Sequence, residues 1–87
     1  MNKPYQKDKQ QAFQAAQQAF VRAQESTNTI EEYSSEFGHQ LKDAEKSIDQ
    51  AEQMILNALE VASEHQRHEL KSFQNELFLL KDQLEQK

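Results

Sequence analysis

Apolar residues recur at steps of three or four positions through the middle of the chain. At about 100° per residue, side chains with this spacing fall on one narrow face of a helix. The members of this stripe are Ile30, Tyr33, Phe37, Leu41, Ala44, Ile48, Ala51, Ile55, Ala58 and Ala62. The pattern therefore predicts a long amphipathic α-helix with one buried face.

A second seam with alternating steps of three and four follows near the end of the chain, which is the spacing that pairs helices. It consists of Leu70, Phe73, Leu77, Leu80 and Leu84. Before the central stripe, Pro4 suits the first turn of a helix whose apolar face is Tyr5, Ala12, Phe13, Ala16, Ala19, Phe20 and Ala23. We predict an all-α fold, an antiparallel three-helix bundle or a long helical hairpin with a shorter N-terminal helix. Residues 1–87 are expected to form a single domain with helices at about 4–26, 29–62 and 64–86.

The boundaries of these helices rest on short polar signals. Thr29 and Glu32 have the T-x-x-E spacing of a capping box, so the second helix is expected to begin at Thr29. Gly38 then marks a kink or a close helix crossing, and a later helix start near residue 38 is the alternative. Ser63 and Gln66 have S-x-x-Q spacing and predict a break, with an uninterrupted helix over 29–86 as the alternative.

The segment from Met54 to Ala62 is apolar on more than one face. Met54, Leu56, Leu59 and Val61 lie on both sides of the stripe residues Ile55 and Ala58. A helix that is apolar this far round is expected to contact more than one neighbour. This segment favours three helices over a simple hairpin.

Charge narrows the choice of partner. The net charge is −5, and residues 25–87 carry six Lys or Arg against fourteen Asp or Glu. Such a body repels nucleic-acid phosphate and anionic lipid, whereas a short basic head with Lys3, Lys7 and Lys9 suits an acidic partner. The chain has no Cys, no apolar signal-peptide region and no apolar run long enough to cross a bilayer. We expect a cytoplasmic protein with no nucleic-acid partner and no stable membrane insertion.

Candidate chemistry is sparse. His65 and His68 share a helix face, but a closed metal site needs about four ligands, and His39 joins them only if the fold brings it near. The carboxylates lie mainly on polar helix faces, and a single Gly excludes a Gly-rich phosphate loop. We predict no catalytic residue, no cofactor and no metal site, and therefore a protein that is not an enzyme.

Phe78 and Leu79 break the pattern of the last seam. Both project about 130° from the centre of the seam formed by their neighbours Leu77 and Leu80. Adjacent exposed apolar side chains indicate a contact surface, so Phe78 and Leu79 are predicted interface residues. The alternative is that they pack under the first helix within the monomer.

Several short segments resemble the YtzC-like family, which comprises small uncharacterised helical proteins of spore-forming bacilli. The resemblance spans roughly residues 15–84. The segments that carry it are Glu32-Tyr33-Ser34, Gln40-Leu41-x-Asp43-Ala44, Ala62-Ser63, Gln66-Arg67-x-Glu69-Leu70 and the closing Leu-rich seam. It implies a small cytoplasmic helical protein and brings no known activity or functional residues.

The function expected from these features is that of a non-enzymatic structural or protein-interaction module acting through helix–helix packing. Its partner is expected to be a second copy in a homodimer, or another helical protein. The alternative is a weak ligand or membrane-surface binder that uses the apolar patch around Phe78 and Leu79. Because surface helices at membranes normally carry Lys and Arg on their polar side, the acidic body argues against anionic membranes.

Overall fold

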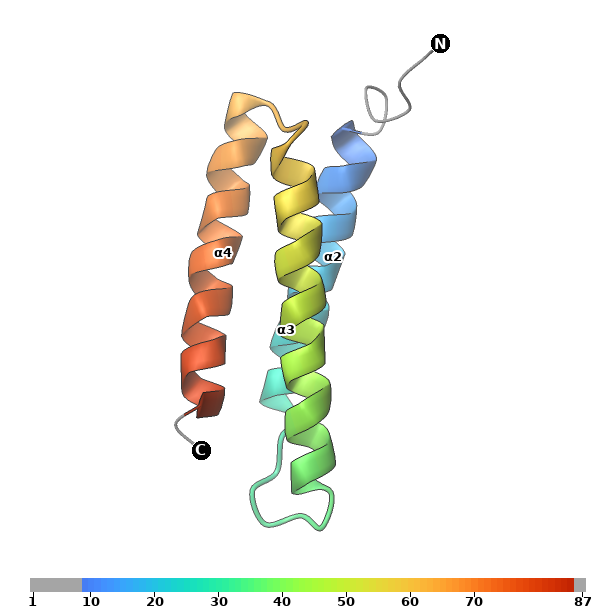
Figure 1. The fold of residues 1–87 in the computed structure, drawn as a ribbon, viewed down its shortest axis with the longest axis vertical. Helices are drawn as coiled ribbons and strands as arrows, with labels where there is room; N and C mark the ends of the chain where they lie inside the picture. Colours follow the sequence, from blue (N-terminus) through green and yellow to red (C-terminus); the bar gives the residue numbers. More distant parts are fainter. Residues whose placement is uncertain (1–8, 86–87) are drawn as a thin grey trace.

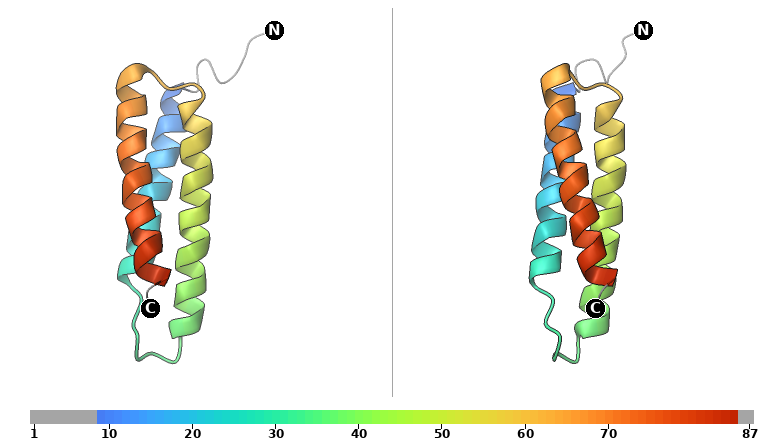
Figure 2. Two further views of the ribbon diagram at one scale, coloured as in Figure 1. Left: turned by 60° about the vertical axis from the view of Figure 1, so that its left-hand side comes forward. Right: turned by 90° about the vertical axis from the view of Figure 1, so that its left-hand side faces the viewer.

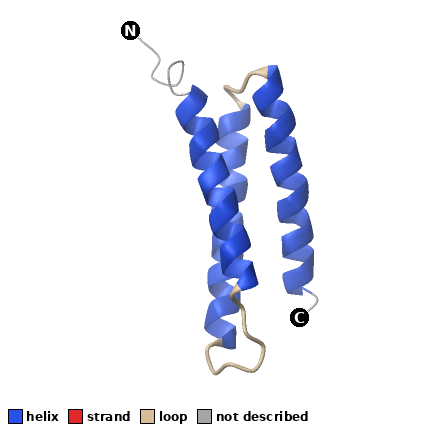
Figure 3. Cartoon of the chain, turned by 180° about the vertical axis from the view of Figure 1, so that it is seen from behind, coloured by secondary structure: helices blue, strands red, loops and turns tan. Residues whose placement is uncertain are grey.

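The computed structural model describes residues 9–85, and over this range the chain is helical with no strand (Figures 1 and 3). The helices are α2 (Lys9–Asn28), α3 (Phe37–Leu59) and α4 (Glu64–Glu85). In the views of Figure 2 they run down, up and down in a three-helix bundle in which every pair is in contact. This confirms the predicted all-α fold. The predicted helix start at Pro4, the side chain of Tyr5 and the basic residues Lys3 and Lys7 lie outside the described residues.

The core of the bundle is formed by the predicted faces. Its buried residues are Ala16, Ala19, Phe20 and Ala23 of α2, Ala44, Ile48, Ala51, Ile55 and Ala58 of α3, and Leu70, Leu77 and Leu84 of α4. The half-buried ring of Phe73 joins α4 to α2, because it stacks on Phe20 at a centroid distance of 4.6 Å and on Phe13 at 6.2 Å. The central stripe is thus confirmed from Ala44 to Ala58, and the seam of the last helix is confirmed throughout α4.

The predicted start of the second helix at Thr29 is wrong. The helix begins at Phe37, close to the alternative start near residue 38, and residues 29–36 form a loop. The hydroxyls of Ser26 and Ser47 lie 3.2 Å apart, so the antiparallel register already leaves the first two turns of α3 beyond the end of α2 (Figure 1). A helix begun at Thr29 would extend about 12 Å further with no neighbour to pack against, and most helical stability in proteins comes from such packing.

The residues of this loop are satisfied by local bonds in place of the predicted capping box. The Thr29 hydroxyl donates to the carbonyl of Ser26 at 3.1 Å, so it does not cap a helix that follows. The N–H of Glu31 donates to the side-chain oxygen of Gln40 at 2.8 Å, which ties the loop to the first turn of α3. Tyr33, predicted on the buried stripe, is 99% exposed, whereas Ile30 still packs against the core from the loop.

Gly38 lies in the first turn of α3 and marks neither a kink nor a close helix crossing. No atom of a neighbouring element comes within 4 Å of the position that a Cβ would occupy there, and its φ is not positive. Neither close packing nor backbone conformation requires glycine at this position.

The predicted break at Ser63 is confirmed. The N–H of Ser63 donates to the side-chain oxygen of Gln66, and the N–H of Gln66 donates to the Ser63 hydroxyl, both at 3.2 Å. This reciprocal pair is the capping box that the spacing predicted, and it satisfies two backbone donors at the start of α4. The chain therefore folds back, and α4 covers the core face of α3.

The apolar segment from Met54 onward is less covered than its composition predicted. Met54 is 42% exposed and Leu56 is 51% exposed, although Ile55 between them is fully buried. The helix does contact both α2 and α4, as this segment predicted. The wide apolar segment therefore adds exposed surface to the bundle and only partly fills its core.

Candidate interaction surface

Two adjacent apolar side chains stand on the outer face of α4. Phe78 is 69% exposed and Leu79 is 55% exposed, whereas Leu77 immediately before them is fully buried. The seam of α4 directs Leu77 and Leu80 toward α2 and α3, and the helical rotation of about 100° per residue turns the next two side chains outward. The predicted exposure of Phe78 and Leu79 is confirmed, and the alternative that they pack within the monomer is wrong.

The edge between α3 and α4 brings a third apolar side chain to the same height. The Lys81 ammonium lies 3.9 Å from a carboxylate oxygen of Glu52, so these two residues lie at about the same level of α4 and α3. The two helices are antiparallel, so a step forward along α3 and a step back along α4 lead in the same direction. We take four residues forward from Glu52 and three residues back from Lys81, which is about one turn in each helix. These steps lead to Leu56 and Phe78, which therefore lie level with each other, one turn from the ion pair.

Helix α2 adds a fourth exposed apolar residue at this level. Helices α2 and α4 run in the same direction, and the Gln66 side-chain amide donates to the side-chain oxygen of Gln10 at 3.3 Å. Eleven residues after Gln10 is Val21, and eleven residues after Gln66 is Leu77, so Val21 and Leu77 lie at about the same level. Val21 is 43% exposed, so it is a further exposed apolar side chain at about the level of Phe78.

We refer to these exposed side chains, which share one height of the bundle, as the apolar belt. It consists of Val21, Leu56, Phe78 and Leu79. Sequence reasoning found Phe78 and Leu79 and missed the other two, because a single exposed apolar residue beside a buried one is common in helices. Only the register between helices shows that the four residues share a level.

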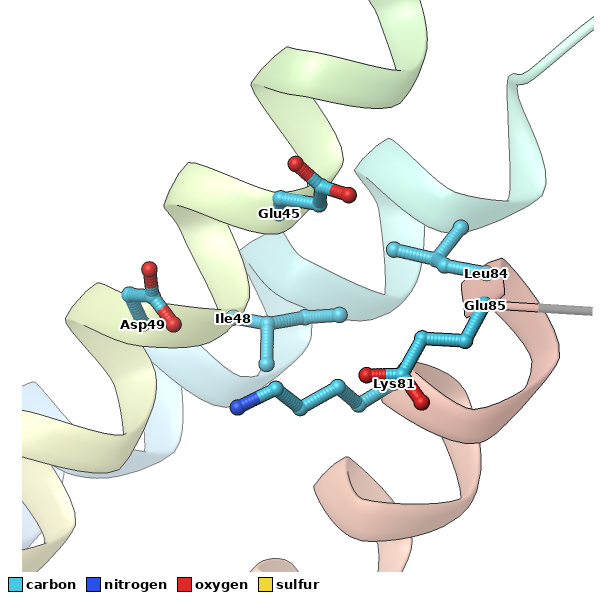
Figure 4. Close-up of a pocket in the computed structure, with 6 residues that line it drawn as sticks. All are labelled: Glu45, Ile48, Asp49, Lys81, Leu84 and Glu85. Atoms are coloured by element: carbon cyan, nitrogen blue, oxygen red, sulfur yellow. The ribbon is translucent and has the colours of Figure 1, made fainter.

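A shallow cavity of about 230 Å³ lies between α3 and α4 (Figure 4), and the α4 residues that line it follow the belt residues Phe78 and Leu79 in the sequence. Its walls are the apolar side chains Ile48 and Leu84 together with the charged residues Glu45, Asp49, Lys81 and Glu85. Lys81 extends along the cavity toward α3 in Figure 4. Pockets for small molecules usually hold about 300–1,000 Å³ and are mostly apolar, so the size and charge of this cavity do not favour a ligand site.

The histidines are placed at opposite ends of the bundle. His39 lies in the first turn of α3, 3.6 Å from the carboxylate of Asp43, whereas His65 lies in the first turn of α4, 3.4 Å from that of Glu69. The fold therefore does not bring His39 to His65 and His68. Within residues 9–85 no three His, Cys, Asp or Glu side chains converge as a metal site would require.

The polar side chains of the described range lie outside the buried core. No polar or charged residue between Lys9 and Glu85 is buried. The structure thus brings no candidate acid, base or nucleophile into an enclosed site, and the non-enzymatic interpretation stays a prediction. Over the same range, none of the helices has the length and apolar character needed to cross a membrane.

Comparison with protein-family models, with curated proteins and with solved structures finds no match for this chain. The resemblance to the YtzC-like family therefore stays a prediction. The exposed apolar side chains of α4 are therefore the feature from which we infer a function.

Proposed function

We propose that this protein is a non-enzymatic interaction module that acts by helix–helix packing and forms a homodimer through the outer face of α4. The observation that carries this proposal is the exposure of Phe78 and Leu79, at 69% and 55%, beside a core that closes without them. Contiguous exposed apolar side chains on a small protein usually mark a contact surface.

The modest core of the bundle supports self-association. The largest fully buried side chains are Ile48, Ile55, Leu70 and Leu77, and most other core positions of α2 and α3 are alanines, which bury little area. A domain of this size gains little stability from one small core, so covering an exposed apolar surface is a substantial addition. A two-fold pair of identical chains lets one patch cover its own copy, which is the most common solution in small oligomers.

The surroundings of the apolar belt favour a protein partner over a lipid surface. Lys71 and Lys81 lie on α4, but Glu76 and Glu85 lie on the same helix, and the net charge of the chain is −5. Helices that bind anionic membranes carry an excess of Lys and Arg beside their apolar face. The same charge disfavours nucleic acid, and we place the protein in the cytoplasm as part of this proposal.

Sedimentation equilibrium tests the proposed homodimer. We expect wild-type protein to have the mass of a dimer at micromolar concentration. The double variant Phe78→Glu, Leu79→Lys is expected to sediment as a monomer and to keep its helical circular dichroism, because both side chains lie outside the core. As a matched control, Gln50→Glu, Gln53→Lys introduces the same charges on an exposed face of α3 and should remain dimeric.

Wild-type protein that is still monomeric at a hundredfold higher concentration would refute the homodimer. Loss of helical signal in the Phe78→Glu, Leu79→Lys variant would show that these residues belong to the core. Co-sedimentation of the monomer with neutral liposomes, lost in the same variant, would favour the lipid-binding alternative.

A further inference from the structure

We infer that the two copies meet with their α4 helices antiparallel, about a two-fold axis beside Phe78. This inference rests on the proposed homodimer and specifies its geometry. It follows from the distribution of charge on either side of Phe78 and from the acidic cavity between α3 and α4.

Charged residues of opposite sign lie symmetrically about Phe78. Lys71 is seven residues before it and Glu85 is seven residues after it, so all three side chains share one face of α4 at intervals of two turns. Lys71 and Glu85 are both exposed. If Phe78 packs beside its copy in an antiparallel pair, Lys71 of each chain lies opposite Glu85 of the other, and two ion pairs flank the apolar contact.

A parallel pair has the opposite electrostatic consequence. In a parallel pair, Lys71 of one chain would face Lys71 of the other, and Glu85 would face Glu85. Each of these pairs would lie two turns from Phe78. Like charges that face each other across a helix pair repel, and such repulsion is a common means of selecting one orientation of paired helices. The charge pattern therefore favours the antiparallel arrangement.

The cavity between α3 and α4 strengthens this complementarity. Glu85 shares the walls of that cavity with Glu45 and Asp49, and Lys81 is the single cation among the residues that line it (Figure 4). The Lys81 ammonium is itself 3.9 Å from Glu52. The acidic residues therefore outnumber the cations at this end of α4, and Lys71 of a second copy would bring a positive charge to it.

The area available indicates a reversible dimer. If each exposed side chain of Phe78 and Leu79 contributes about 100 Å², two copies bury roughly 400 Å² of apolar surface between them. Stable interfaces bury about 1,200–2,000 Å² in total, so the polar rim and the flanking residues Leu56 and Val21 must supply the rest. We expect dissociation on dilution and a clear dependence on the flanking charges.

A charge swap tests the orientation. In the antiparallel dimer, Lys71→Glu and Glu85→Lys should each raise the dissociation constant about threefold to tenfold, because each affects both ion pairs. The double variant should return to within about twofold of wild type, and the differences should shrink in high salt. Lys46→Glu, on an exposed face of α3, makes the same charge change away from α4 and should leave the constant unchanged.

Cross-linking gives an independent reading, because the chain has no cysteine of its own. Asn75 and Asp82 lie on either side of the Phe78–Leu79 pair on the outer face of α4. In the antiparallel dimer, a mixture of Asn75→Cys and Asp82→Cys chains should form the mixed disulfide on oxidation, and each variant alone should remain largely reduced.

These experiments distinguish failure of the antiparallel arrangement from failure of the homodimer itself. A wild-type dimer in which Asn75→Cys links to its own copy, or in which the double charge swap fails to restore association, would overturn the antiparallel arrangement and leave the homodimer standing. A monomeric wild type would overturn both.

Discussion

Leu77 and Leu79 lie two residues apart on α4. Substituting each by Ala makes the same chemical change in the same helix, so the two variants differ mainly in how deeply the lost side chain was buried. Leu77 is fully buried and Leu79 is 55% exposed. Leu→Ala alters the intrinsic helix propensity equally at both positions. Any difference between the two variants therefore measures what the core gains from the side chain of Leu77.

The expected difference follows from the lost apolar area. Leu→Ala removes three carbons, which are worth about 2.4 kcal/mol when fully buried at about 0.8 kcal/mol each. The cavity left behind in the core raises the cost of Leu77→Ala to about 3–4 kcal/mol. The side chain of Leu79 is less than half buried, so Leu79→Ala should cost about 1 kcal/mol in the monomer.

Urea denaturation followed by circular dichroism measures both free energies of unfolding. The protein should be dilute enough to be monomeric, so that the loss of an interface does not add to the cost of Leu79→Ala. Gln50→Ala, on an exposed face of α3, serves as a control and should cost less than about 0.5 kcal/mol. If Leu77→Ala and Leu79→Ala lower the free energy of unfolding equally, the assignment of the buried and exposed faces of α4 is wrong.

Three further predictions concern the helix ends and the charge of the surface. Ser63→Ala should lower stability by about 1 kcal/mol in the same denaturation assay, whereas Thr29→Ala should have little effect, because only Ser63 caps the start of a helix. Gly38→Ala should raise the free energy of unfolding by about 0.5–1 kcal/mol, since the position is helical and open, and no gain would show that glycine is needed there. In a mobility-shift assay at physiological salt, low-micromolar protein should not retard duplex DNA, and a shift that weakens with added salt would contradict the expected exclusion of nucleic acid.

The buried faces of the helices could be predicted from the sequence because they depend on spacing alone. Ala44, Ile48 and Ile55 recur at helical intervals, and so do Leu70 and Leu77, and an amphipathic helix has only one way to bury such a stripe. The capping box at Ser63 was equally local, since its bonds join residues three positions apart. These features needed no knowledge of how the helices meet.

The errors arose where the relation between helices decides the outcome. Thr29 begins no helix, because the register set beside Ser26 and Ser47 leaves that segment without a neighbour. The same dependence applies to the apolar belt. Phe78 could be identified from the sequence because it departs from the seam of its own helix. Leu56 lies level with Phe78 because of the register between α3 and α4, which the Lys81–Glu52 ion pair indicates. The sequence of a single helix does not determine that register.

A single tryptophan at the centre of the apolar belt tests the self-association most directly. The chain contains no Trp, so the emission of a Phe78→Trp variant reports on this position alone. We expect the emission maximum to shift to shorter wavelength as the protein concentration rises through the micromolar range, together with the change from monomer to dimer mass, while a Gln50→Trp control keeps the emission of an exposed indole. If the Phe78→Trp emission stays that of a solvent-exposed indole at every concentration, the outer face of α4 is not the surface through which this protein associates.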